Sequence, residues 1–243
     1  MFTEANQDTI YRPHNLFIWF LLAFQGGWLN IGGFLAVHRF VSHITGYGTL
    51  LGDKLAIGDL HNAAGFSLVP IFYLIGIMVS AWFIERRRLR SRPPRYPLVF
   101  TLIILNLIVV TVAGVNGHFG VFGETLSYKR DFVLLFLLAY TCGLQNAVIS
   151  SASGSVIRTT HLTGVTTDLG IGIIRMWTNR SHLDEKEVFI FGCRLGIILS
   201  FILGSIIGAI LFKQVQFYGF VVPVILSVFV GYRLRIFQPL LKH

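Results

Sequence analysis

Long apolar runs separated by short polar stretches dominate this chain of 243 residues. Each run can cross a membrane as a helix, because about 20 residues at 1.5 Å per residue cover the ~30 Å hydrocarbon core of a bilayer. The pattern therefore predicts an all-α integral membrane protein with six transmembrane helices, at residues 16–37, 63–84, 97–116, 132–151, 188–212 and 217–236.

One short motif occurs twice and divides the chain into two similar units. The first copy runs from Ser42 to Gly52 and the second from Thr160 to Gly170, and six of the eleven aligned residues are identical. Each copy follows an apolar run that contains Gly-x-x-Asn, ending at Asn30 and at Asn146. A repeat of this kind indicates a duplicated membrane protein.

The two units set the expected organisation of the chain. Each unit contains three of the predicted helices. We expect, in order, a cytoplasmic tail at 1–15, a first three-helix repeat at 16–116, a connecting loop at 117–131, a second three-helix repeat at 132–236 and a cytoplasmic tail at 237–243.

The distribution of Lys and Arg favours six spans over eight. In the eight-span alternative both motif copies cross the membrane and the two halves run parallel. Six spans place fourteen Lys and Arg residues inside and five outside, whereas eight spans leave about nine against ten. Because cytoplasmic loops are enriched in Lys and Arg, six spans with both termini inside are preferred. Three helices per half then invert the second repeat relative to the first.

Composition supports the membrane class and changes the meaning of the net charge. Hydrophobic residues make up 54% of the chain and charged residues 13%, whereas about a quarter of a soluble domain is charged. A net charge of +9 would suggest nucleic acid as the partner of a soluble protein. Here six arginines lie between Arg86 and Arg95, in the loop between two spans. We therefore expect this loop to contact anionic lipid headgroups and expect no nucleic-acid partner.

The repeated His-x-Thr-Gly is the main candidate for chemistry. It offers a hydroxyl, exposed backbone groups and an imidazole that titrates near neutral pH. Re-entrant or broken helices in corresponding places of two inverted repeats are typical of a transporter's central site. The structural alternative is a tight turn in which Thr caps a helix. The expected substrate-binding residues are Asn30, His43, Thr45, Gly46, Gln145, Asn146, His161, Thr163, Gly164 and Thr167.

Two charged residues form a second candidate group. Asp168 lies inside the second motif copy, and Arg194 is the one charge well inside an apolar run. A charge at the centre of a membrane helix costs about 2.5–3.5 kcal/mol on insertion scales, so such residues are functional candidates. We expect Asp168 and Arg194 to form a charged pair or a coupling group. The alternative for Arg194 is that it extends to the cytoplasmic surface.

Enzyme signatures are missing from the sequence. It contains no zinc-binding His-Glu-x-x-His, no Cys-x-x-Cys, no P-loop and no Gly-x-Ser-x-Gly. The stretch Ser151–Gly154 could supply the serine nucleophile of an intramembrane enzyme, which is the alternative, but no general base is placed beside it. We expect no enzymatic activity, no cofactor and no metal site.

Small residues recur every fourth position along the fifth predicted span. This spacing lets membrane helices approach closely, and it also offers an interface for a homodimer. The residues are Gly192, Gly196, Ser200, Gly204 and Gly208.

The two motif regions resemble the YoaK-type family of uncharacterised bacterial inner-membrane proteins. The similarity lies in Gly27–Gly52, in Gly143–Ala147 and in Arg158–Gly170, and it extends over nearly the whole chain. Asn30 and Tyr47 differ from the family pattern, which has Asp and Asn at these places. The resemblance implies a six-span protein of the bacterial inner membrane and brings no established substrate.

Together these patterns favour a transporter of a small solute that works by alternating access. An ion or solute channel would share the inverted repeat without needing coupled movement of the halves. A non-transporting scaffold or sensor is favoured if both motifs serve only packing.

Overall fold

The computed structural model describes residues 13–124, 129–153, 162–178 and 185–237, and within these ranges it contains helices and no strand. His161 and most of both terminal tails lie outside the described residues. In chain order the helices are α2 (Pro13–Val37), α3 (Ile44–Ala56), α4 (Leu60–Phe83), α5 (Glu85–Leu89), α6 (Tyr96–Val115), α7 (Lys129–Ala152), α8 (Leu162–Thr178), α9 (Glu185–Val215), the 3₁₀ helix η1 (Gln216–Phe220) and α10 (Val221–Phe237).

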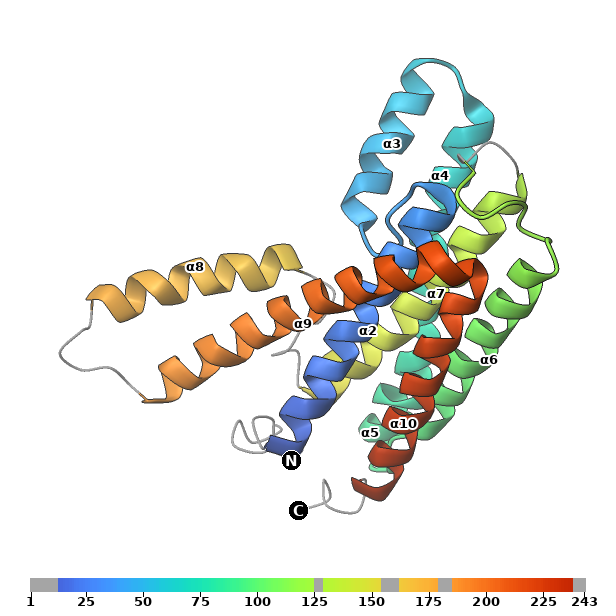
Figure 1. Cartoon of the computed structure of the whole chain (residues 1–243). Coiled ribbons are helices and arrows are strands. Elements are labelled where there is room, and N and C mark those ends of the chain that lie inside the picture. Colours follow the sequence, from blue (N-terminus) through green and yellow to red (C-terminus); the bar gives the residue numbers. More distant parts are fainter. Residues whose placement is uncertain (1–12, 125–128, 154–161, 179–184, 238–243) are drawn as a thin grey trace.

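Five helical stretches of the described chain are long and apolar enough to cross a membrane. The first four correspond to the first four predicted spans. The fifth, Glu187–Leu234, contains α9, η1 and α10, so the helical chain continues through a 3₁₀ turn where the sequence predicted a break between two spans. The chain changes direction at this turn (Figure 1). The prediction of an all-helical protein with membrane-length helices is confirmed.

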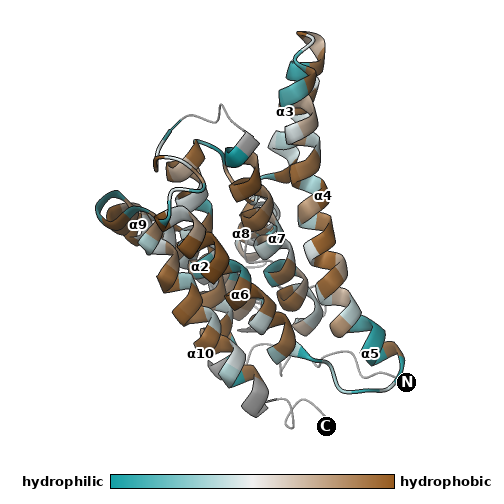
Figure 2. Ribbon diagram, turned by 90° about the vertical axis from the view of Figure 1, so that its right-hand side faces the viewer, coloured by the Kyte–Doolittle hydropathy of each residue, from teal (hydrophilic) through white to brown (hydrophobic). Residues whose placement is uncertain are grey.

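Apolar side chains cover much of the outer surface of the bundle. Figure 2 shows hydrophobic residues along α4, α6 and α10 and hydrophilic residues at α5. On α4 the large side chains of Leu74, Met78 and Trp82 are exposed, and on α6 those of Leu105 and Val112. An apolar surface of this extent is unusual for a soluble protein and suits contact with lipid.

The central helices pack in two extensive pairs, α2 with α9 and α4 with α7. α6 packs on α10, and α2 also contacts α7. The helices that carry the repeated motif pack on the helix that follows them, α3 on α4 and α8 on α9. The start of α2, the short α5 and the end of α10 lie at one end of the bundle, and α3 lies at the other (Figure 1).

Glycines bring α2 and α9 into backbone contact. A Cβ atom at Gly27 would overlap the carbonyl oxygen of Phe201, and one at Gly204 would overlap the carbonyl oxygen of Phe24. Lipid is as apolar as the protein interior, so helices in a membrane associate through van der Waals packing more than through the hydrophobic effect. Close approach at glycine maximises that packing.

The contact between α4 and α7 is built in the same way. A Cβ atom at Gly143 would overlap the carbonyl oxygen of Tyr73, and one at Gly76 would overlap the carbonyl oxygen of Tyr140. Gly143 is the first residue of the second Gly-x-x-Asn. The structure therefore gives the glycine of that pattern a packing role.

The small-residue stripe of α9 faces α2 of the same chain. A Cβ at Gly196 would lie 2.6 Å from the Phe20 ring, and one at Gly208 would lie 3.3 Å from the Trp28 ring. The predicted close packing is thus made within one chain, and this part of the stripe is not free to form a dimer interface. Gly192, at the beginning of the stripe, has open space around it.

Gly143→Val is expected to separate α7 from α4, because the added side chain would overlap backbone atoms. Overpacking of this kind costs about 1–3 kcal/mol, so we expect a lower melting temperature of the purified protein in detergent. Gly192→Val is the matched control, since no atom of the described chain lies within 4 Å of its Cβ position. Equal destabilisation by both substitutions would contradict the packing role of Gly143.

Candidate functional site

The first motif copy lies at the start of α3. His43 is the N-cap residue, its side chain makes no capping hydrogen bond, and its carbonyl oxygen accepts from the Gly46 N–H at 3.0 Å. A Cβ at Gly46 would lie 2.7 Å from His43 Nδ1, so glycine leaves room for the imidazole beside the helix. Thr45 is exposed. In the described structure this copy begins a continuous helix, and the helix is not broken.

Two side chains hold the first motif copy against the bundle. Asn30 Oδ1 accepts hydrogen bonds from both the backbone N–H and the hydroxyl of Ser42, each at 3.2 Å. Tyr47, the buried residue of α3, donates its hydroxyl to the Phe40 carbonyl at 2.6 Å. Asn30 therefore has a clear local role in fixing the turn that leads into α3, in addition to any role in binding.

The second motif copy begins α8 in a similar way. Thr163 and Thr167 are exposed, Gly164 is half-buried, and Val165 is the buried residue of the helix. Thr167 Oγ1 donates to the Thr163 carbonyl at 2.9 Å, and Thr49 makes the corresponding contact with the Thr45 carbonyl in α3, at 3.5 Å. The two copies thus share a local structure where both are described. His161 lies just before the described part of α8.

Asp168 and Arg194 form the predicted pair. The Nη2 atom of Arg194 lies 3.5 Å from Asp168 Oδ2, and Nη1 donates to the Asp168 backbone carbonyl at 3.3 Å. The pair joins α8 to α9. The side chains are 55% and 34% exposed for Asp168 and Arg194, so the charges are not enclosed by protein.

The structure does not bring the described residues of the two motif copies together. α3 packs on α4 at one end of the bundle, and α8 packs on α9 to the side of it (Figure 1). The two copies therefore occupy separate places, and their described residues do not contribute to a group of fully buried polar side chains inside the bundle.

That group lies where α2, α7 and α10 meet. Gln25, Gln145 and Ser227 are each at most 1% exposed. Gln25 Nε2 donates to Gln145 Oε1 at 3.1 Å and to Ser227 Oγ at 2.9 Å, and Gln145 Nε2 donates to the Leu22 carbonyl at 2.9 Å. Gln25 Oε1 is buried and has no hydrogen-bond partner in the described structure. We call Gln25, Gln145 and Ser227 the central amide cluster.

Further polar contacts extend from the central amide cluster through α7. Asn146 Nδ2 donates to the Tyr73 hydroxyl on α4. Asn106 Nδ2 on α6 donates to Thr141 Oγ1 at 2.6 Å and to the Leu137 carbonyl at 2.8 Å. Gln145 and Asn146 were expected as binding residues from the sequence, whereas Gln25, Ser227 and Thr141 were not. Gln25, Ser227 and Thr141 could have been found in the sequence as polar residues inside long apolar runs.

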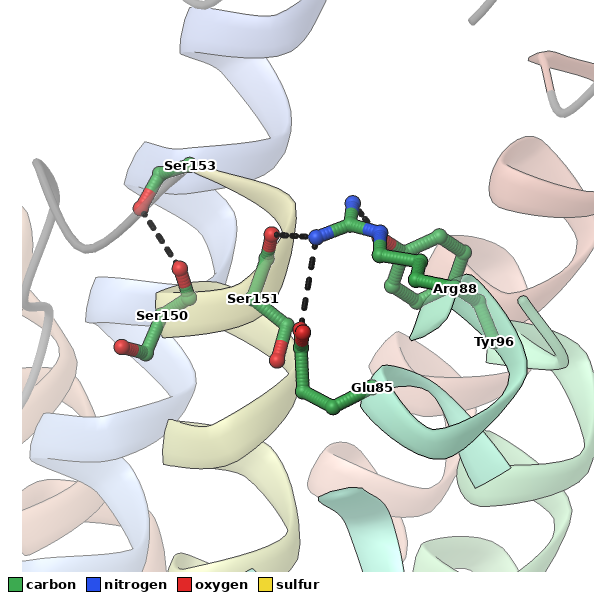
Figure 3. A network of polar contacts seen from close by, with 6 residues as sticks. All are labelled: Glu85, Arg88, Tyr96, Ser150, Ser151 and Ser153. Atoms are coloured by element: carbon green, nitrogen blue, oxygen red, sulfur yellow. Dashed lines mark hydrogen bonds and ion pairs between the residues drawn. The ribbon is translucent and has the colours of Figure 1, made fainter. Parts of the chain in front are cut away.

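A second polar network lies at the end of the bundle near α5. Arg88 Nη1 donates to the Ser151 carbonyl at 2.6 Å and to Glu85 Oε1 at 3.3 Å, and Nη2 donates to the Tyr96 hydroxyl at 2.7 Å. Figure 3 shows the guanidinium between the end of α7 and the start of α6. From sequence Arg88 was one of six arginines in a basic loop, and nothing distinguished it from its neighbours.

Other kinds of chemistry find little support in the described residues. Within them, no three His, Cys, Asp or Glu side chains gather as metal ligands. Cys142 and Cys193 are both buried free thiols, as expected for small core residues.

Gln145→Leu should destabilise the protein by about 1–3 kcal/mol, because it removes the buried hydrogen bonds that Gln145 makes with the Gln25 amide and with the Leu22 carbonyl. Gln25→Leu/Gln145→Leu should cost less than the sum of the two single substitutions, since both members of the contact are then removed. Chemical unfolding of the three variants measures the coupling. Strictly additive losses would show that the two amides do not interact.

Asp168→Asn should change stability by less than about 1 kcal/mol, because exposed ion pairs contribute little. Arg194→Gln should have a similarly small effect. Thermal unfolding of both variants beside the unmodified protein provides the measurement. A loss of several kcal/mol from either substitution would mean that the pair is structural.

Comparison with known proteins places the chain in a family. No curated protein and no solved structure matches it significantly. The family model described as "Protein of unknown function (DUF1275)" matches residues 18–232, which include both motif copies and the three residues of the central amide cluster. This confirms the family recognised from the motifs: the chain belongs to the DUF1275 family of proteins of unknown function.

Proposed function

We propose that this protein crosses the bacterial inner membrane six times, as two inverted three-helix repeats with both termini in the cytoplasm. The glycine contacts support the repeat. Gly27 on α2 and Gly143 on α7 are the same distance apart in sequence as Phe24 and Tyr140 on these two helices. In both helices the glycine approaches a carbonyl of the facing helix, and the aromatic residue offers its own carbonyl to a glycine of that helix. On the partner helices, Gly76 of α4 approaches a carbonyl of α7 in the same way that Gly204 of α9 approaches a carbonyl of α2.

The pairing of the helices supports the inversion. The three helices of the first half, α2, α4 and α6, correspond in order to α7, α9 and α10 of the second half. The packing of α2 against α9 therefore has its counterpart in the packing of α7 against α4. The motif helices correspond as well, since α3 packs on α4 as α8 packs on α9. With α9 and α10 as separate crossings each half has three, and an odd number reverses the orientation of the second half.

We further propose that the protein transports a small polar solute through the region of the central amide cluster. The observation that carries this proposal is the buried Gln25 Oε1, which lacks a hydrogen-bond partner among the described residues at the contact between the two repeats. An unsatisfied buried acceptor costs free energy, and a solute or water that donates a hydrogen bond would remove that cost. Inverted-repeat transporters bind their substrates at the repeat interface near the middle of the membrane.

In this proposal the motif helices serve the two ends of the pathway. α3 follows the end of α2, and α8 follows the end of α7, so inversion places the two copies on opposite faces. His43, Thr45 and Gly46 would line one opening, and His161, Thr163 and Gly164 the other. The Asp168–Arg194 pair, which joins α8 to α9, is then positioned to change when the second opening moves.

Single-cysteine labelling tests both the topology and the pathway. The background is Cys142→Ala/Cys193→Ala, and the reagent is a membrane-impermeant maleimide applied to intact cells or to inverted vesicles. We expect Thr45→Cys to react from the periplasmic face and Thr163→Cys from the cytoplasmic face, because both side chains are exposed on motif helices of opposite orientation. Labelling of both from the same face would contradict the inverted repeat.

The same assay applied to Gln145→Cys addresses function. An alternating-access transporter should expose this position from either face in part of the population, although the static structure buries it. Val69→Cys, on the fully buried side of α4, is the control and should remain unreactive. If Gln145→Cys is as unreactive as Val69→Cys, the central amide cluster is a packing device and no pathway passes it.

A further inference from the structure

The loop between α4 and α6 forms a pocket whose walls are mainly arginine. The pocket has a volume of about 160 Å³, roughly ten times the ~15 Å³ that one ordered water requires. We call it the arginine pocket, and its lining includes Trp82 together with Arg86, Arg87, Arg90, Arg92 and Arg95. It lies at the end of the bundle that also holds the start of α2 and the end of α10 (Figure 1).

Backbone hydrogen bonds give this loop a defined shape. The Arg95 N–H donates to the Phe83 carbonyl at 3.1 Å, which returns the chain to the end of α4. The Arg92 N–H donates to the Arg87 carbonyl at 2.8 Å, and Arg87 Nε donates to the Pro93 carbonyl at 2.7 Å. The arginines are therefore presented by a folded loop with internal bonds.

No carboxylate of the described residues pairs with the arginines of the arginine pocket. Arg92 and Arg95 lie close enough to Arg87 to act on it as like charges. Like charges held together in one pocket repel one another, and an anion between them would remove that repulsion.

Arg88 differs from the other arginines of the 86–95 loop because it does not line the arginine pocket. The one arginine of the 86–95 loop that does not line the pocket is the one bound to Glu85, Tyr96 and the Ser151 carbonyl (Figure 3). The loop thus separates an anchoring arginine from five that have no carboxylate partner among the described residues. A bias of positive charge toward the cytoplasm explains why the loop is basic, but it requires neither a pocket nor this separation.

We propose that the arginine pocket binds a phosphate-bearing anion. The planar guanidinium presents its N–H groups in a fork that matches the oxygens of a phosphate, and several arginines can share one phosphate group. Arg86 lies over the Trp82 ring at 3.7 Å, a contact that holds the guanidinium at the edge of the pocket.

The position of Trp82 indicates that the arginine pocket lies at the level of the lipid headgroups. Trp82 is 57% exposed near the end of α4, and tryptophan is enriched where membrane helices meet the lipid headgroups. The phosphate could therefore belong to an anionic lipid or to a soluble molecule in the cytoplasm. Both sources present the same chemistry, and this proposal does not depend on transport.

Binding to the purified full-length protein distinguishes the two sources. In one arm, inorganic phosphate is titrated into protein in a neutral detergent and followed by calorimetry. In the other arm, the protein is placed in nanodiscs of phosphatidylcholine with or without phosphatidylglycerol, and retained lipid is counted by native mass spectrometry. Saturable binding in the first arm identifies a soluble phosphate, and retention of phosphatidylglycerol alone identifies a lipid headgroup.

Arg92→Gln/Arg95→Gln should weaken binding about tenfold or more in whichever arm shows it, because each cation near a phosphate contributes substantially to affinity. Arg175→Gln/Arg233→Gln removes the same charge from exposed positions outside the pocket and should change binding less than about twofold. Equal loss in both variants would reduce the effect to general charge attraction and overturn the proposal.

Arg92→Lys/Arg95→Lys separates binding from folding and membrane insertion, since it keeps both positive charges. We expect its melting temperature to match that of the unmodified protein and its binding to be intermediate, because lysine lacks the guanidinium fork. Full binding by this variant would show that the loop acts only as a charged surface. The absence of binding by the unmodified protein in both arms would also overturn the proposal.

Discussion

The packing of α2 on α9 and of α4 on α7 depends on four glycines, because at each of them any side chain would overlap a backbone carbonyl of the facing helix. In lipid the helices gain little from the hydrophobic effect, so the closeness of the backbones carries much of the association. Each pair joins a helix of the first half to one of the second. The glycines therefore hold the two halves together as well as the individual helices.

This close packing determines what happens to polar side chains inside the bundle. Gln25 and Gln145 cannot face lipid without leaving their amides unsatisfied, and the helix contacts place them against each other and against Ser227. Most of their hydrogen-bonding groups are satisfied in this way. The exception is Gln25 Oε1, which has no hydrogen-bond partner in the described part of the chain, and this acceptor at the contact between the halves distinguishes the region from ordinary packing.

The six arginines of the 86–95 loop, at the end of the bundle, have two different environments. Arg88 connects α5 to α6 and α7 through two hydrogen bonds, to the Tyr96 hydroxyl and the Ser151 carbonyl, and so acts as part of the framework. The five other arginines of the 86–95 loop share a pocket without carboxylate partners in the described structure. One basic segment thus combines an arginine whose guanidinium joins helices with five arginines that have no carboxylate partner among the described residues.

The sequence by itself determined the helical class, the first four membrane-length helices and the places of both motif copies, because long apolar runs must satisfy their backbone hydrogen bonds within helices. It also suggested that Asp168 and Arg194 form a charged pair or a coupling group, and their side chains lie 3.5 Å apart. Only the tertiary structure decided that Gln25 meets Ser227, 202 residues away, and that Arg88 differs from its neighbours. Such contacts depend on the rotation and spacing of packed helices, which the local pattern of residues does not specify.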